Sequence, residues 1–319
     1  MNIYIPFVCL ALGAAINWRG LPAPALRWAD RITSLALYML MVVIGINIGT
    51  SREVMGNLDR IGLNCFLISL SAVFCSVLVV FLLEKTVMPL EKIRLQLHME
   101  KGETPLQIAA AEEGRSGFSS LVILMPGCIA IGIAGGYFLL RDIDKGLLDN
   151  LLTASLVCLY TGVGVSLAEN KSVFSYIRRL GFRVLFMPVG IFAGCLLGGL
   201  GAGMVLDVPV SWSALSASGM GYYSLTGAAM TESFGIEAGT YGFIVNILRD
   251  VLTVALLPVL IKVSKGSPIA SGAAGCMDSM LVPVSRFVGP ELSMVALISG
   301  TILTFVVPVW LPVGVGLMG

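Results

Sequence analysis

The feature that most constrains the fold is an apolar stretch, residues 239–262, with an arginine and an aspartate side by side in its middle. A stretch of this length can cross a bilayer core of about 30 Å, and each ionised side chain at mid-depth costs on the order of 2.5–3.5 kcal/mol. Asn246 precedes Asp250 by four residues and Thr253 follows it by three, so on a helix they form one polar stripe. We expect this stripe to face a cavity inside the protein.

Composition places the chain in a membrane. Hydrophobic residues make up 57% of its 319 residues and charged residues only 12%, which is too little polar surface to cover a soluble globule. The lipid bilayer is therefore its expected surroundings, and a net charge of +1 offers no basic surface to a nucleic acid. The single His98, the absence of metal-ligand spacing among the cysteines and the lack of a GxxxxGK[ST] pattern predict no cofactor, no metal site and no ATP-driven motor.

Apolar runs of spanning length predict an all-α polytopic membrane protein with about eight transmembrane helices. Two further segments, residues 209–234 and 266–285, are less apolar and rich in Gly, Ser and Ala. We expect these two to be re-entrant or broken helices, which are tolerated at membrane depth only where protein or a watery cavity surrounds them. The eight expected crossings are residues 2–17, 32–49, 61–83, 119–140, 151–167, 182–206, 239–262 and 292–316.

The distribution of Lys and Arg predicts the orientation. Among the first five connections between spans, most basic residues fall in the first, third and fifth, which the positive-inside rule places in the cytoplasm. The N-terminus is then outside. If both glycine-rich segments re-enter the side that they left, Lys262 and Lys265 also lie inside, and the C-terminus ends outside.

An internal repeat is visible in the sequence. Residues 44–62 align without gaps on residues 163–181 at an offset of 119, and the same offset pairs Gly13 with Gly132. Because each unit contains an odd number of crossings, the two copies must be inverted, as in many secondary transporters. Chance similarity between apolar segments is the alternative. The organisation expected is a first three-span repeat at 1–83, a cytoplasmic polar loop at 84–117, a second, inverted repeat at 118–206 and a transport core at 207–319.

Four charged residues do not fit loops or span ends: Glu232, Arg249, Asp250 and Asp278. We interpret Asp250 and Asp278 as binding substrate or protons. Adjacent side chains on a helix diverge by about 100 degrees, so Arg249 needs a partner other than Asp250, and a structural ion pair with Glu232 or Asp278 is the alternative to a binding role. Glu232 is either a site residue or a carboxylate at the membrane interface.

Two further polar residues lie in the repeated spans. Asn47 and its repeat partner Ser166 either add polar atoms near the repeat axis or form ordinary interhelical hydrogen bonds.

Three segments give the chain a resemblance to a known family. The runs SASGMGYYSLTGAAMTESFG, NILRDVLTVALLPVLI and SGAAGCMDSMLVPV resemble the LysO family of bacterial lysine exporters. The resemblance covers nearly the whole chain and implies export of L-lysine and its toxic analogues across the inner membrane, with eight spans and both termini outside. It implies that the family's intramembrane acidic pair is Asp250 and Asp278, with the motif of Tyr222, Tyr223 and Ser224 in support.

The hypothesis that follows is proton/lysine antiport. Asp250 and Asp278 would face the ammonium groups of lysine, and Arg249 or the amides of a half-helix would receive its carboxylate. A carboxylate can hold either a proton or an ammonium group, which couples the two fluxes. A sodium-coupled amino-acid carrier is the alternative among transporters, and an intramembrane aspartyl protease with a carboxylate dyad is the alternative among enzymes.

Overall fold

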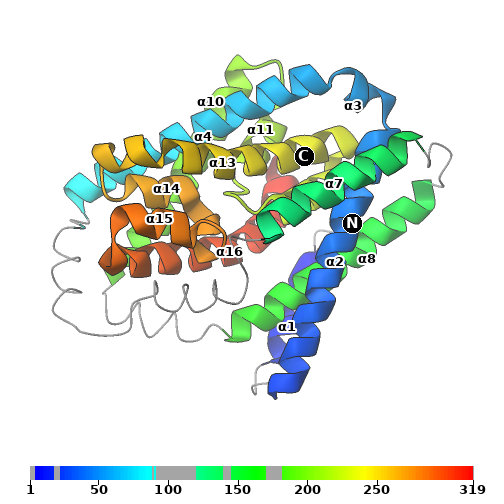
Figure 1. Cartoon of the computed structure of the whole chain (residues 1–319), viewed down its shortest axis with the longest axis horizontal. Helices are drawn as coiled ribbons and strands as arrows, with labels where there is room; N and C mark the ends of the chain where they lie inside the picture. The colour runs from blue at the N-terminus through cyan, green and yellow to red at the C-terminus, as the bar shows by residue number, and fades with distance from the viewer. Residues whose placement is uncertain are drawn as a thin grey trace.

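The computed structural model describes residues 4–17, 22–87, 90, 120–138, 145–169 and 182–318. Within these ranges all regular structure is helical, as predicted (Figure 1). The long helices are α1 (Tyr4–Ile16), α2 (Ala23–Thr50), α4 (Leu58–Thr86), α7 (Ser120–Phe138), α8 (Lys145–Glu169), α10 (Phe186–Val205), α13 (Ile236–Val263) and α16 (Pro290–Met318). The short ones are α3 (Arg52–Gly56), η1 (Phe182–Leu185), α11 (Val210–Ala217), α12 (Tyr223–Phe234), α14 (Ser267–Gly272), η2 (Ala273–Met277) and α15 (Leu281–Val288).

Each of the eight expected crossings corresponds to one long helix. By length and composition six of them can cross a membrane, and α1 and α7 contribute shorter apolar helices. The chain is therefore a multi-pass membrane protein. Of the polar loop expected at 84–117, residues 88, 89 and 91–117 lie outside the described residues.

The long helices fall into two groups (Figure 1). Helices α1, α2, α7 and α8 pack mainly on one another, and we call them the four-helix group. Helices α4, α10, α13 and α16 pack against the short helices α11, α12, α14 and α15, and we call these eight helices the core group. The groups meet chiefly where α2 and α8 contact α12 and α13. The charged stretch on α13 is thus surrounded by protein.

Close glycine contacts in the four-helix group support the internal repeat. A Cβ on Gly13 would lie 3.0 Å from the Cα of Gly164, and a Cβ on Gly132 would lie 2.9 Å from the Cα of Gly45. The 119-residue offset pairs Gly13 with Gly132 and Gly45 with Gly164. Replacing each glycine by its repeat partner therefore converts the contact between Gly13 and Gly164 into the contact between Gly132 and Gly45. We propose a twofold relation between the predicted repeats, because such a relation requires this exchange of contacts.

Both glycine-rich segments are broken helices, as expected. In the first, α11 and α12 are separated by residues 218–222, and in the second, α14 and η2 are separated from α15 by residues 278–280. At a rise of about 1.5 Å per residue, none of these helices is long enough to cross a bilayer. We call the two segments hairpin 1 (residues 210–234) and hairpin 2 (residues 267–288).

The hairpins and the long helices that follow them are also alike. Gly235 and Gly289, which are 54 residues apart, both have a φ of 91° and directly precede α13 and α16. A φ in this region favours glycine. A glycine of the same conformation therefore connects each hairpin to the long helix that follows it. The structure therefore contains two units of the form hairpin, glycine, long helix.

Candidate substrate site

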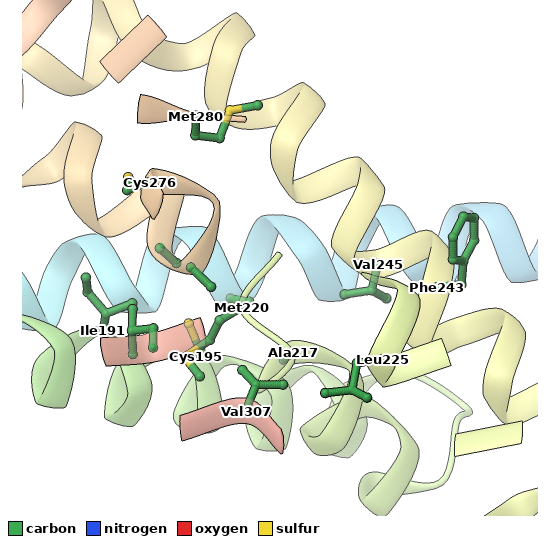
Figure 2. Close-up of a cluster of buried hydrophobic side chains, with 14 of the residues drawn as sticks. Ile191, Cys195, Ala217, Met220, Leu225, Phe243, Val245, Cys276, Met280 and Val307 are labelled. Atoms are coloured by element: carbon green, nitrogen blue, oxygen red, sulfur yellow. The ribbon is translucent and has the colours of Figure 1, made fainter. Parts of the chain in front are cut away.

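The breaks of the two hairpins meet inside the core group. The amide of Ala274 donates to the carbonyl of Met220 over 3.0 Å, which joins hairpin 2 to hairpin 1. Near this contact Met220 and Ala273 have φ values of 54° and 44°, and Gly221 has 97°. Figure 2 shows Met220 between Cys195 of α10 and the turn that carries Cys276. Strained backbone of this kind concentrates at binding sites and switch regions.

Asn246 on α13 holds the break of hairpin 1 in place. Its side-chain oxygen accepts from the amide of Gly221 over 2.7 Å, and its side-chain nitrogen donates to the carbonyls of Ser216 and Gly242 over 2.9 and 2.7 Å. The side chain is 1% exposed. Asn246 therefore supplies a hydrogen-bond acceptor to the amide of Gly221 and ties the break to α13.

Asp250 lies one turn further along α13, beside the same break. Its Oδ1 is buried and has no hydrogen-bond partner among the described residues. A Cβ added to Gly221 would lie 3.3 Å from this oxygen, so the carboxyl group faces the backbone just before α12. Helix α12 begins at Tyr223 without a side-chain cap, which leaves its positive end toward the carboxyl group.

Asp278 belongs to the break of hairpin 2. It follows η2 directly, its own amide donates to the carbonyl of Gly275 over 3.1 Å, and its Oδ1 accepts from the amide of Ser279. Its side chain is exposed. It interacts electrostatically with Asp250, Tyr222 and Tyr223. The two expected carboxylates thus lie in one electrostatic neighbourhood.

Arg249 is fully enclosed, with 1% of its surface exposed. Its guanidinium group donates to the carbonyls of Ala270 and Ser271 over 2.8 and 2.9 Å, at the end of α14. It also contacts the thiol of Cys195 at 3.0 Å and the hydroxyl of Ser76 at 3.3 Å. Because the carboxyl end of a helix carries partial negative charge, α14 stabilises the arginine.

The ion pair considered for Arg249 is wrong for the described part of the chain. The guanidinium group makes no salt bridge there with Glu232, Asp278 or another carboxylate. The physical reason is that four contacts to uncharged groups already use most of its five N–H donors. The same contacts leave little of the group available to a substrate carboxylate.

The remaining candidates divide between the breaks and other places. Tyr222 is the residue before α12, Tyr223 packs edge-on against Phe243 at 5.7 Å between ring centroids, and Ser224 is buried in the first turn. Glu232 lies near the other end of α12, roughly 13 Å along the helix from Tyr223. There it accepts from the hydroxyl of Thr153 on α8 over 3.1 Å.

Asn47 and Ser166 are on α2 and α8, in the four-helix group. Asn47 is buried, and its side-chain nitrogen has no partner among the described residues, while Ser166 is half-buried. Neither belongs to the elements that form the breaks.

Sequence reasoning missed the two residues that flank the Arg249 side chain from α4 and α10. Ser76 and Cys195 are separated by the 119-residue offset of the predicted repeat, and both contact the guanidinium group. The signal was present, because extending the repeat alignment along α4 and α10 pairs these positions. It also missed Trp310 on α16, whose indole donates to the hydroxyl of Ser218 over 2.9 Å.

Known proteins are similar to this chain over most of its length. The chain matches the family described as "Lysine exporter LysO" over residues 7–98 and 127–315. It is 28% identical over 309 residues to "Lysine exporter LysO" of Escherichia coli (strain K12), covering 97% of each chain. It is 24% identical over 156 residues to a "Putative lysine exporter" of Haemophilus influenzae, covering 49% of this chain and 80% of the other. No solved structure matches. The chain belongs to the LysO family of lysine exporters.

Proposed function

We propose that this protein exports L-lysine and lysine analogues across the bacterial inner membrane in exchange for protons. Family membership supports lysine as the substrate. One structural observation carries the rest of the proposal: the buried Oδ1 of Asp250 has no hydrogen-bond partner among the described residues, and this carboxyl group interacts electrostatically with that of Asp278 where two broken helices meet. A buried acceptor without a partner costs roughly 1–3 kcal/mol, so we expect a ligand or a proton to supply one.

The site offers complementary groups to both ends of lysine. Asp250 and Asp278 can accept hydrogen bonds from ammonium groups. The carboxylate of lysine needs donors, and the contacts of Arg249 leave the first-turn amides of α12 as the better candidate. Tyr222, Tyr223 and Ser224 would then border the ligand as supporting residues, with Asn246 holding the break.

Competition between a proton and an ammonium group provides the coupling. A carboxyl group that has taken up a proton no longer attracts an ammonium group, so proton binding from outside releases lysine there. The protonated site then opens to the cytoplasm, where it exchanges its proton for the next lysine. This cycle requires that the site be open to one side at a time, as in other transporters built from inverted repeats.

Flux measurement in proteoliposomes tests the proposal. Vesicles are loaded with labelled lysine, and efflux is followed after an inward proton gradient is imposed. We expect the gradient to accelerate efflux, and we expect Asp250→Asn and Asp278→Asn to abolish this acceleration. Asp207→Asn is the matched control, because Asp207 lies in an exposed ion pair with Arg60. Normal efflux from either site variant would contradict the assigned roles.

The same assay addresses the sodium-coupled alternative. If external or internal sodium is required and a proton gradient has no effect, the coupling ion is sodium. Cleavage of a membrane peptide by the purified protein would instead support the aspartyl protease hypothesis.

A further inference from the structure

The charges of the site do not cancel. Asp250 and Asp278 contribute two negative charges, and Arg249 contributes one positive charge. Asp250 interacts electrostatically with Asp278 and with Arg249, and all three interact with Cys276. No other charged residue in the described part of the chain interacts with Asp250. Without ligand or proton, the site therefore carries a net charge of −1.

The other groups around the site are neutral at physiological pH. Tyr223 on α12 and Cys276 on η2 face Asp250 electrostatically, and Tyr38 on α2 interacts with Tyr223. Tyrosine hydroxyls and thiols are uncharged near neutral pH. The remaining charged residues on the surrounding short helices and on α13 are near helix ends: Glu232 on α12, Glu237 in the first turn and Lys262 in the last turn of α13, and Arg286 in the last turn of α15.

The position of Arg249 makes its charge a fixed part of the site. Its guanidinium group is held by the last carbonyls of α14 and by Ser76 and Cys195 at the crossing of α4 and α10. All of these elements belong to the core group, as do both hairpins. The arginine therefore neutralises one of the two carboxylates in every state in which the core group stays intact.

We propose that Arg249 is the fixed countercharge of this site, so that the site takes up one lysine cation or one proton in turn and the exchange is one for one and electrically neutral. This inference rests on the proposed function. Lysine carries a net charge of +1 near neutral pH, and either one lysine or one proton brings the site to neutrality. The empty, unprotonated site would carry an uncompensated charge inside the membrane, which is costly. Only the two neutral forms then change sides readily, which enforces exchange.

Arg249 is a positioning residue under this proposal and does not touch the substrate. Its side chain also fixes the end of α14 and, through it, η2 and Asp278. A loss of rate on mutation alone would not separate the electrostatic role from the structural one. The coupling ratio and the effect of membrane voltage do separate them.

The test measures coupling in proteoliposomes that contain the full-length wild-type protein. Valinomycin and potassium set the membrane potential, and the proton gradient is varied independently. We expect the potential, with either sign, to leave lysine flux unchanged. We also expect a tenfold lysine gradient to be balanced by a pH difference of about one unit. If the tenfold lysine gradient is balanced by a pH difference near half a unit, or if membrane voltage drives lysine flux, the inference is wrong, but proton/lysine antiport is still supported. Absence of any proton-driven flux would instead refute the proposed function.

Two variants test the role of the arginine. Arg249→Lys retains the charge and loses the planar fork, so we expect slower but still voltage-independent exchange. Arg249→Met removes the charge, and we expect lysine flux to fall by more than about tenfold. If Arg249→Met folds, as judged by gel filtration and its melting temperature, and still exchanges one for one without a voltage effect, the countercharge role is wrong. If it does not fold, the wild-type measurement decides.

Discussion

At the scale of single residues, Asn246 determines whether the break of hairpin 1 keeps its shape. Its amide group makes three hydrogen bonds in an enclosed position. Asn246→Ala leaves the amide of Gly221 without this acceptor, and a buried unpaired group costs roughly 1–3 kcal/mol. We expect a lower melting temperature and the loss of most lysine efflux, because Gly221 borders the Asp250 carboxyl group.

Asn64→Ala is the matched comparison for this prediction. Asn64 is also a nearly buried helical asparagine, but the structure gives its side chain a single hydrogen bond, to the hydroxyl of Tyr241 over 3.2 Å. We expect a smaller change in melting temperature and near-normal efflux. Equal effects of the two substitutions would show that Asn246 has no special role at the break.

The individual site residues were partly accessible to sequence reasoning. The cost of charge inside an apolar run singled out Asp250 and Asp278, and the structure brings them into one electrostatic neighbourhood. The partners of Arg249 could not be predicted in the same way. Two of them are backbone carbonyls. Every residue has a carbonyl, and it is free to accept from a side chain chiefly where a helix ends.

At the scale of helices, glycine contacts set how closely the four-helix group packs. A Cβ on Gly132 of α7 would lie 2.5 Å from the carbonyl oxygen of Val42 on α2, which is too close for any real Cβ. We expect Gly132→Ala to push the two helices apart and to destabilise the protein by roughly 1–3 kcal/mol. The melting temperature of the purified protein measures this change.

Gly135→Ala is the control on the same helix. Gly135 lies three residues further along α7, and a Cβ there would meet nothing within 4 Å. We expect it to leave the melting temperature unchanged or to raise it, because alanine favours helix over glycine by about 1 kcal/mol. A fall as large as that of Gly132→Ala would show that the close contact between α2 and α7 is unimportant.

The sequence predicted the broken helices from their composition, but it did not predict where they break. Hydropathy and small residues identified residues 209–234 and 266–285, and the structure has a hairpin in each. The breaks themselves include Met220 and Ala273, which are not residues that normally adopt positive φ. Their conformation depends on contacts across the two hairpins, such as that between Met220 and Ala274, and a single segment contains no sign of its partner.

At the scale of the whole molecule, contacts at the ends of the long helices show which ends share a side. Arg60, just inside α4, forms an ion pair with Asp207, just after α10, at 2.7 Å. At the other end of α4, the carboxylate of Glu84 accepts from the amide of Gly266, just after α13, over 3.2 Å. Tyr241 near the start of α13 bonds to Asn64 near the start of α4, so α13 runs parallel to α4.

This arrangement supports re-entry of hairpin 1. Helix α10 ends beside the start of α4, and α13 starts on that same side, so the segment between them leaves and returns to one side of the membrane. A full crossing by that segment would have placed the start of α13 beside Glu84. The positive-inside rule then predicts that the side with Glu84, Lys262 and Lys265 is cytoplasmic.

Labelling of introduced cysteines tests the orientation in the full-length protein. Asp207 and Lys262 are exposed and lie at opposite ends of the core group, so Asp207→Cys and Lys262→Cys report on the two sides. In intact cells we expect a membrane-impermeant maleimide to label Asp207→Cys, and to label Lys262→Cys only after the membrane is permeabilised. The unsubstituted protein, whose seven cysteines are buried or half-buried, gives the background. The reverse pattern would invert the orientation while keeping the fold. Labelling of both variants in intact cells would contradict the inference that α13 crosses the membrane, because its two ends would then share one side.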